Sequence, residues 1–294
     1  MDKQDLWVLD GGMGRELARR GAPFRQPEWS ALALMEAPET VREVHQAYAT
    51  SGARVITTNS YALVPFHIGE ARFAAQGEAL AALAGQLARD VADEQGGAVK
   101  VAGSLPPLFG SYRADLYQAE RVSELATPLI RALSPHVDLW LAETMSLIAE
   151  PLALKALLPE DGKPFWVSFT LEDEAPGSEP TLRSGERVAD AVTALASAGV
   201  DAILFNCCQP EVIEGALEVA STRLQALGRA LLQRPTEHGF GTELWTLKRV
   251  GVLIERLYGV KFGQTQIWRI LGALGFSVQK PERRALERDE DAVQ

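Results

Sequence analysis

The feature that most constrains the fold of this chain is an alternation between short apolar runs and longer amphipathic stretches over residues 6–224. The apolar runs have the length and composition of strands that are covered on both faces. They predict six strands: Leu6–Leu9, Arg54–Thr58, Val99–Ala102, Asp138–Ala142, Phe165–Thr170 and Asp201–Phe205. Strands of this kind are typical of parallel sheets that lie beneath helices.

The stretches between the runs place apolar residues three and four positions apart, which predicts helices. The predicted helices are Thr40–Ser51, Phe73–Glu94, Val122–Leu133, Ala149–Leu158, Glu186–Ala198 and Pro210–Leu224. Strand-then-helix units in series favour an α/β fold with a parallel sheet. Both an open doubly wound sheet and a (β/α)₈ barrel of the TIM type fit this order.

The glycine-rich run Asp10-Gly11-Gly12-Met13-Gly14 follows the first predicted strand and superficially resembles a dinucleotide-binding loop. It lacks the G-x-G-x-x-G spacing, and no acidic residue ends a second strand about 20 residues further on. Nucleotide binding is therefore the weaker interpretation of this loop.

Polar side chains stand at the ends of the predicted strands. They are Asp10, Thr58, Asn59, Ser104, Glu143, Thr170, Asn206 and Cys207. In a parallel barrel the C-terminal ends of the strands meet at one edge, where the chemistry takes place. Polarity also returns wherever a buried strand ends, but that explanation accounts for one or two of these positions rather than all of them.

Composition narrows the class of protein. The chain is 47% hydrophobic and 23% charged, as in soluble globular proteins. It contains no apolar run long enough for a membrane helix, and the polar segment Met1–Asp5 does not resemble a signal peptide. The two cysteines are adjacent and cannot staple a secreted fold, so we expect a cytoplasmic protein.

Five motifs follow one another along residues 5–224. They are Leu9–Gly14, Thr57–Tyr61, Ala102–Pro107, Ala142–Thr144 and Phe205–Cys208. Together they resemble the homocysteine S-methyltransferases, zinc-dependent (β/α)₈ enzymes that take a methyl group from S-methylmethionine, betaine or a related donor. The resemblance implies a TIM-type barrel of which about six of the eight strand–helix units are present.

The resemblance also implies a zinc site. Members of the family bind zinc through three cysteines, and the fourth position takes the homocysteine sulfur, whose pKa the metal lowers. The first of these cysteines corresponds to Cys207. The other two form a Gly-Gly-Cys-Cys motif after the eighth strand. Alternatively, Cys207 is a small buried hydrophobic residue.

Further positions correspond to the family's amino-acid pocket. Asp10 and Glu143 match the acidic groups that hold the ammonium of the substrate, which is sensible electrostatics for a cation. Thr58 and the backbone at Gly11 match positions that line the pocket. The alternative is that Asp10 and Glu143 are local caps of a turn and a helix.

The resemblance ends at about Leu224, and neither the last two strands nor the Gly-Gly-Cys-Cys motif follows. Residues 229–294 carry 11 Lys and Arg against 8 Asp and Glu, a net charge of +3. The whole chain has a charge of −10, so residues 1–228 carry −13. The charge step predicts two segments of different origin, at residues 1–227 and 228–294.

The second segment predicts two helices joined by a turn, Leu247–Tyr258 and Gln264–Leu274, and a wing at Phe276–Arg284. It resembles the winged helix-turn-helix part of mariner-like insertion-sequence transposases, which implies a recognition helix for the DNA major groove. The residues expected to face DNA are Gln264, Gln266, Arg269, Lys280, Arg283 and Arg284. Alternatively, the two helices form a hairpin that only packs.

These observations lead to one main expectation about activity. Because one cysteine, or two adjacent ones, cannot supply three thiolates, we expect methyl transfer to homocysteine to be lost or nearly lost. The alternatives are a transposase-derived DNA-binding fusion and a non-functional remnant. A barrel with about six units leaves open sheet edges, which predicts self-association.

Overall fold

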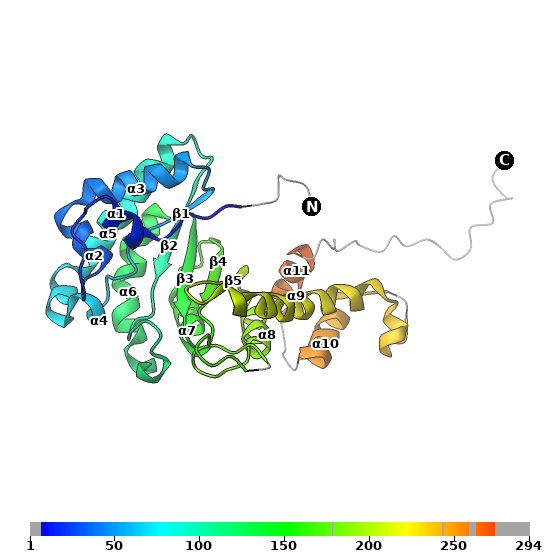
Figure 1. The fold of residues 1–294 in the computed structure, drawn as a ribbon. Helices are drawn as coiled ribbons and strands as arrows, with labels where there is room; N and C mark the ends of the chain where they lie inside the picture. The colour runs from blue at the N-terminus through cyan, green and yellow to red at the C-terminus, as the bar shows by residue number, and fades with distance from the viewer. Residues whose placement is uncertain (1–6, 178, 243, 259–262, 274–294) are drawn as a thin grey trace, which may run out of the picture. The chain divides into compact units, whose positions relative to one another are not determined.

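The computed structural model describes residues 7–177, 179–242, 244–258 and 263–273. The chain divides into two compact units, Met1–Arg223 and Leu224–Gln294 (Figure 1). The division falls within helix α9 (Pro210–Leu232), as does the boundary predicted between residues 227 and 228. No helix among the described residues is both long and apolar enough to cross a lipid bilayer.

The first unit contains a curled sheet of parallel strands in sequence order, which confirms the predicted α/β fold (Figure 1). The strands are β1 (Val55–Thr57), β2 (Lys100–Leu105), β3 (Leu139–Met145), β4 (Phe165–Phe169) and β5 (Ala202–Phe205). β5 forms one edge of the described sheet, so the predicted self-association through open edges remains a prediction.

The first predicted strand, Leu6–Leu9, requires a correction. In the described residues it consists of a single parallel bridge between Leu9 and Val55, because Val8 lies exposed at the rim and the chain leaves the sheet at Asp10. The amide of Asp10 donates to the carbonyl of Val55 at 3.0 Å. This short pairing still places the Asp10 side chain beside the end of β1.

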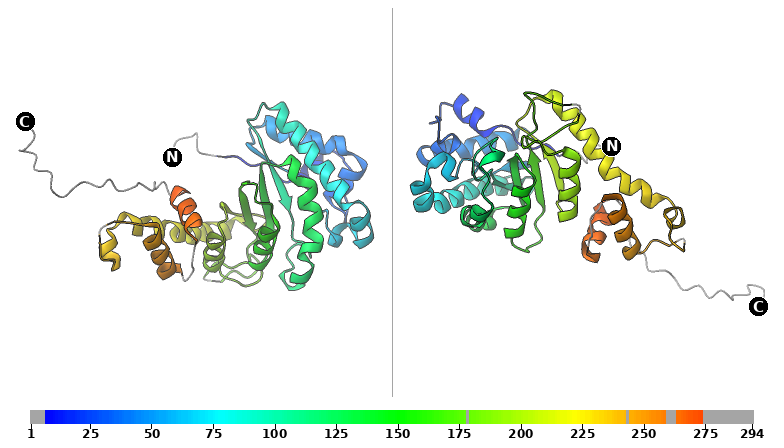
Figure 2. Two further views of the ribbon diagram at one scale, coloured as in Figure 1. Left: turned by 180° about the vertical axis from the view of Figure 1, so that it is seen from behind. Right: turned by 90° about the horizontal axis from the view of Figure 1, so that it is seen from below.

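Helices cover the outer face of the sheet, and Figure 2 shows α5 and α6 side by side there. The longer helices are α3 (Pro38–Thr50), α5 (Glu70–Glu94), α6 (Val122–Leu133), α7 (Ala149–Leu157), α8 (Val188–Ala198) and α9. Five of these six agree with the predicted helices to within a few residues. The exception, α9, continues past the predicted end at Leu224 because the lone Gly228 does not stop a helix.

Three short helices did not emerge from the sequence: α1 (Met13–Arg19), α2 (Ser30–Glu36) and α4 (Pro65–Ile68). They contain 7, 7 and 4 residues, so they are too short for a helical repeat of apolar residues to stand out in the sequence. They lie in the loops that follow the Leu9 bridge and β1.

The core lies on both faces of the sheet. On the outer face Trp140, Phe165 and Phe169 are fully buried beneath the helices. On the inner face of the curl Leu139 and Leu141 pack with Val55, Ala102 and the partly buried Trp166. Burying each large side chain contributes about 2 kcal/mol, so the sheet is a firm support for the loops at its C-terminal edge.

The second unit contains α10 (Leu247–Tyr258) and α11 (Gln264–Ala273), which confirms the two predicted helices within the described residues. Their core consists of Ala230, Leu231, Val250, Leu253, Ile254, Ile267 and Leu271. The two helices approach closely, because a Cβ on Gly251 would lie 2.8 Å from Ile267. The predicted wing at residues 276–284 lies outside the described residues.

Candidate functional site

The predicted site residues of the first unit converge on one edge of the sheet, at the C-terminal ends of its strands. Asp10 follows the Leu9 bridge, Thr58 follows β1, Glu143 lies near the end of β3 and Cys207 follows β5. Because all these strands are parallel, their C-terminal ends lie together. We call this region the C-terminal edge.

Asp10 is held by the neighbouring strand. One carboxylate oxygen, Oδ2, accepts a hydrogen bond from the backbone amide of Thr57 at 2.7 Å, and Oδ1 accepts one from the Thr57 hydroxyl at 3.0 Å. Burial raises the pKa of Asp10 to about 6, against the lowering effect of these hydrogen bonds. The two bonds fix the orientation of the carboxylate.

Glu143 is the second carboxylate of the C-terminal edge. Its Oε1 accepts a hydrogen bond from the hydroxyl of Ser104 on the adjacent strand β2. Burial, together with the nearby charge of Asp10, raises the pKa of Glu143 to about 7 against the lowering effect of the Ser104 hydrogen bond. The two carboxylates therefore act on each other; we call them the acidic pair. Within the described part of the chain neither forms an ion pair, so a bound cation would stabilise both.

Thr58 lies behind the acidic pair rather than at its surface. Its side chain is buried, lies 2.9 Å from the Ser60 hydroxyl and accepts the amide of Ser104 at 3.0 Å. Thr58 thus fixes the end of β2 that carries the hydrogen-bond donor of Glu143. Its predicted contact with a substrate remains a prediction.

Gly11 is exposed at the loop that follows Asp10. A Cβ at this position would lie 2.9 Å from the hydroxyl of Tyr48, so a larger residue would displace that ring. Tyr48 donates a hydrogen bond to the carbonyl of Gly12 at 3.3 Å. The absence of a side chain at Gly11 therefore lets Tyr48 close over the loop.

Tyr61, in the segment after β1, lies near Glu143 of the acidic pair. Its hydroxyl lies 2.6 Å from that of Ser111, on the loop after β2. Burial raises the pKa of Tyr61, and the charge of Glu143 adds to the effect. The Thr57–Tyr61 motif contained this residue, but nothing in the sequence indicated that its hydroxyl would face Ser111.

Cys207, Asn206 and Thr144 form what we call the thiol end of the site. The Cys207 sulfur is exposed and accepts hydrogen bonds from the Asn206 amide at 3.4 Å and the Thr144 hydroxyl at 3.9 Å. Asn206 also donates to the Thr144 hydroxyl at 3.0 Å, and its carbonyl oxygen accepts from Ser168 at 2.7 Å. Side chains from β3, β4 and the end of β5 thus position the thiol.

The backbone is strained at the same place. Tyr112, Thr144 and Cys207 have φ angles of 63°, 60° and 52°, in the left-handed region that disfavours side chains other than glycine. For the β-branched Thr144 this is especially costly, and such strain tends to gather at functional sites. Burial and the Cys207 thiol together raise the pKa of Tyr112 to about 12, so the two side chains are neighbours.

The chain resembles known proteins in both sequence and fold. The family model of homocysteine S-methyltransferase matches residues 7–245. The chain belongs to the homocysteine S-methyltransferase family. It is 34% identical over 241 residues to the Escherichia coli homocysteine S-methyltransferase, covering 74% of each chain. It is 32% identical over 236 residues to homocysteine S-methyltransferase 1 of Zea mays, covering 71% of each.

Solved structures in the family share the fold. The metallated homocysteine methyltransferase MmuM of Escherichia coli aligns with a TM-score of 0.62 at 34% identity, covering 77% of this chain and 81% of that one. The apo form of MmuM aligns with a TM-score of 0.57 at 27% identity, covering 92% and 97%. The chain therefore has the fold of this barrel family, and the described sheet forms part of such a barrel.

The side chains of this family member do not fit the three-thiolate zinc site that the resemblance implies. The sequence contains two cysteines, and the second, Cys208, is partly buried against the hydrophobic core. Burial raises the pKa of the Cys208 thiol, which disfavours the thiolate. Among the residues that the structure describes, no group of three His, Cys, Asp or Glu side chains is placed to hold a metal ion.

A second family model, winged helix-turn-helix, matches residues 241–294. Of the residues expected to face DNA, Gln264 lies exposed at the start of α11. Gln266 and Arg269 belong to the same helix. Lys280, Arg283 and Arg284 lie outside the described residues, so their predicted phosphate contacts remain predictions.

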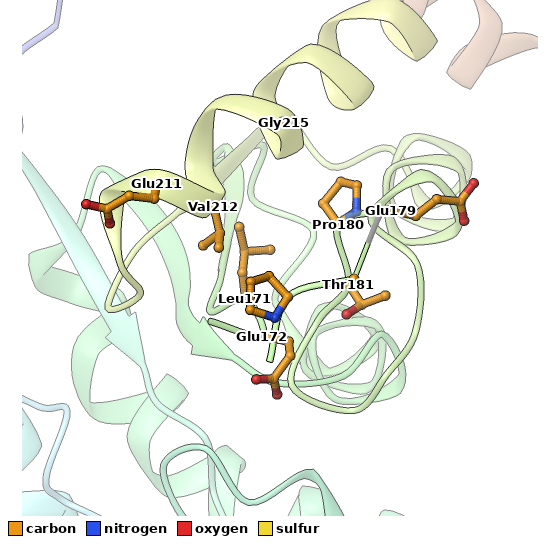
Figure 3. Close-up of a pocket in the computed structure, with 10 residues that line it drawn as sticks. Leu171, Glu172, Glu179, Pro180, Thr181, Glu211, Val212 and Gly215 are labelled. Carbon is orange, nitrogen blue, oxygen red and sulfur yellow. The ribbon is translucent and has the colours of Figure 1, made fainter. Parts of the chain in front are cut away.

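A separate cavity of about 240 Å³ lies between the loop after β4 and the first turns of α9 (Figure 3). Leu171 and Val212 line it, with Glu172, Glu179 and Glu211 among its polar residues. None of the predicted site residues lines this cavity. It is therefore distinct from the acidic pair and the thiol end.

Proposed function

We propose that this chain binds homocysteine at the C-terminal edge through the acidic pair and is impaired in the zinc-dependent methyl transfer of its family. The observation that carries the proposal is the contrast between the two parts of the site. Asp10 and Glu143 are both present, oriented and without an ion-pair partner in the described residues. Cys207 is one thiol where three would be needed.

The electrostatics of the acidic pair support an ammonium as the ligand. Two carboxylates in a largely buried setting repel each other, and a cation between them relieves both the repulsion and the loss of hydration. Charge-assisted hydrogen bonds from an ammonium are roughly twice as strong as neutral ones. Binding of the amino-acid part of homocysteine requires only these residues and not the metal.

Methyl transfer requires more than binding. A free thiol with a pKa of about 8.5 is largely protonated at neutral pH, and the thiolate is the nucleophile. When bound, zinc supplies the chemistry that ionises and holds this thiol. We infer that the single ligand Cys207 does not retain the metal, which leaves the homocysteine thiol without activation.

Calorimetric titration of the full chain tests the binding half of the proposal. L-homocysteine is compared with 4-mercaptobutanoic acid, which keeps the thiol and the carboxylate and lacks the ammonium. We expect homocysteine to bind at least tenfold more tightly, the equivalent of about 1.4 kcal/mol for the charge-assisted contacts. Equal affinities would overturn the assignment of the acidic pair.

The winged helix-turn-helix match supports a second proposal, sequence-dependent or general DNA binding by the second unit. Since phosphate contacts release counterions, binding should weaken at least tenfold between 50 and 200 mM salt, order-of-magnitude values for such contacts. Fluorescence anisotropy of the full chain on labelled duplex DNA measures this. Arg269→Ala should weaken binding while Arg187→Ala, in the first unit, should not. Absence of binding at 50 mM salt would contradict the proposal.

A further inference from the structure

A hairpin after β4 carries an ion pair to which no role has been assigned. Its described residues are 171–177 and 179–187, and an antiparallel bridge joins Leu171 to Leu182. Asp173 follows Leu171 on the outgoing arm, and Arg183 begins the turn that follows Leu182. Because the bridge fixes the two arms, the ion pair is held at a defined place above the end of β4.

The ion pair is largely buried, and its two side chains differ in how many of their polar atoms form hydrogen bonds. Nη2 of Arg183 donates to Oδ1 of Asp173 at 2.6 Å, and Oδ2 of Asp173 accepts the amide of Gln209 at 2.8 Å. The side chains are 15% and 8% exposed. Nε of Arg183 is buried and makes no hydrogen bond to the described residues. A buried donor without a partner destabilises the folded chain, so a role outside stability is indicated.

Tyr112 connects this ion pair to the thiol end. The guanidinium of Arg183 lies over the Tyr112 ring, 5.2 Å from its centre, and the Tyr112 hydroxyl interacts with the Cys207 thiol. The ion pair therefore lies beside the thiol end.

The acidic pair, in contrast, forms no ion pair with Arg183 among the described residues. The carboxylate oxygens of Asp10 and Glu143 accept their hydrogen bonds from Thr57 and Ser104 instead, and β1, which positions Asp10, is separated from β4 by two strands. In an α-amino acid the ammonium and the carboxylate are attached to one carbon. The carboxylate of a homocysteine held by the acidic pair must therefore stay near Asp10 and Glu143, and Arg183 is left for a different molecule.

We propose that Arg183 and Asp173 form a head-group subsite for a methyl donor of the amino-acid type, a sulfonium that also carries a carboxylate and an ammonium. The assignment rests on the proposed function, in which homocysteine occupies the acidic pair. The planar guanidinium suits a carboxylate, which Asp10 and Glu143 repel, and Asp173 suits the ammonium. A donor seated here places its sulfonium toward the thiol end.

Calorimetry on the full chain tests the subsite directly, with and without homocysteine present. The probes are S-methyl-L-methionine and trimethylsulfonium, which has the same sulfonium charge and lacks the head group. We expect S-methylmethionine to bind at least tenfold more tightly than trimethylsulfonium. Arg183→Gln should abolish that tenfold difference, the loss expected for one charge-assisted contact. The homocysteine affinity should not change.

Two further variants guard the interpretation. Arg187→Gln removes the same charge from the same hairpin at an exposed position and should leave the S-methylmethionine affinity unchanged. Arg183→Lys keeps the charge without the planar fork and should weaken binding less than Arg183→Gln does, which provides a test if the glutamine variant does not fold.

The outcomes separate this inference from the proposed function. An S-methylmethionine affinity within twofold of wild type in Arg183→Gln, or no binding of this probe to the wild-type chain, overturns the subsite. An equal loss of homocysteine affinity in Arg183→Gln also overturns it and assigns Arg183 to the acceptor. If homocysteine does not bind but S-methylmethionine binds through Arg183, the subsite stands and the proposed function fails.

Discussion

The acidic pair and the thiol end occupy the same edge of one sheet, yet they differ in completeness. Asp10 and Glu143 are each fixed by a donor from an adjacent strand, Thr57 and Ser104 respectively. Cys207 is equally well placed by Thr144 and Asn206 but has no further thiolate beside it other than the partly buried Cys208. In the proposed function the acidic pair acts alone, whereas the thiol end would need further thiolates.

The difference follows from where each part is encoded. The acidic pair comes from residues 10 and 143, well inside the segment that matches the methyltransferase family. By the resemblance described above, the cysteines that would complete the thiol end are expected after the eighth strand. Here a winged helix-turn-helix match begins at residue 241 instead. The proposed substrate binding and the metal activation expected from the resemblance are thus assigned to different parts of the chain.

The largest effect should come from the acidic pair. Glu143→Gln should weaken homocysteine binding by about 100-fold, because the ammonium loses a buried charged partner and Asp10 alone remains. Cys207→Ser should change the same affinity less than threefold, since the metal is not needed for this contact. Calorimetry on both variants measures the contrast.

A melting curve serves as the control for that pair of variants. Glu143→Gln removes a carboxylate whose burial is unfavourable, so its melting temperature should equal or exceed that of the wild type. If Cys207→Ser cost as much homocysteine affinity as Glu143→Gln, the two parts of the site would not be separable.

The pH dependence of binding should show the next largest effect. The pKa values of about 6 for Asp10 and about 7 for Glu143 mean that both carboxylates are protonated in acid. Homocysteine affinity should therefore rise on the order of tenfold between pH 5.5 and 8, as the acidic pair ionises. A profile that is flat over this interval would contradict the assignment.

The same shifts predict the stability of the ligand-free protein. A raised folded-state pKa contributes stability that is present below the unfolded value and is lost as the pH rises through the folded value. The free energy of unfolding should accordingly fall by about 2 kcal/mol from pH 5 to 8 on account of Glu143. Denaturant titrations should show a smaller fall in Glu143→Gln; an equal fall in both proteins would assign the effect to other groups.

A smaller effect on homocysteine affinity should distinguish the serine that supports the acidic pair from the serine that supports the thiol end. Ser104→Ala removes the hydroxyl that donates to Glu143 and should weaken homocysteine binding roughly fivefold, as expected for one hydrogen bond of about 1 kcal/mol. Ser168→Ala removes the hydroxyl that holds Asn206 at the thiol end and should leave this affinity unchanged. Equal effects in calorimetry would show that both supports serve the same ligand.

Part of this architecture could be predicted from the sequence. The apolar runs located the strands because strands covered on both faces are apolar throughout, and the motifs at their ends located Asp10, Glu143 and Cys207. The predicted strand Leu6–Leu9 is longer than the pairing found. Its apolar composition does not reveal that Val8 lies exposed at the rim of the sheet. The helices α1, α2 and α4, of 7, 7 and 4 residues, are too short to show a helical repeat of apolar residues.

The neighbours of the thiol end could not be predicted, because distant residues determine their positions. The loop after β2 brings Ser111 to Tyr61 and Tyr112 to Cys207, and it is held by Glu150, which accepts the amide of Leu108 at 2.8 Å. No periodicity or motif marks such a contact. The left-handed backbone of non-glycine residues at this edge has no signal in sequence either.

Zinc content, measured together with turnover, tests the central claim most directly. The full chain is purified, equilibrated with zinc and dialysed, and its metal is determined by mass spectrometry alongside methionine formation from S-methylmethionine and homocysteine. The account predicts far less than one zinc per chain and background methionine formation, while homocysteine still binds in calorimetry. One zinc per chain that is lost in Cys207→Ser, with methionine formed by the wild type, would contradict it.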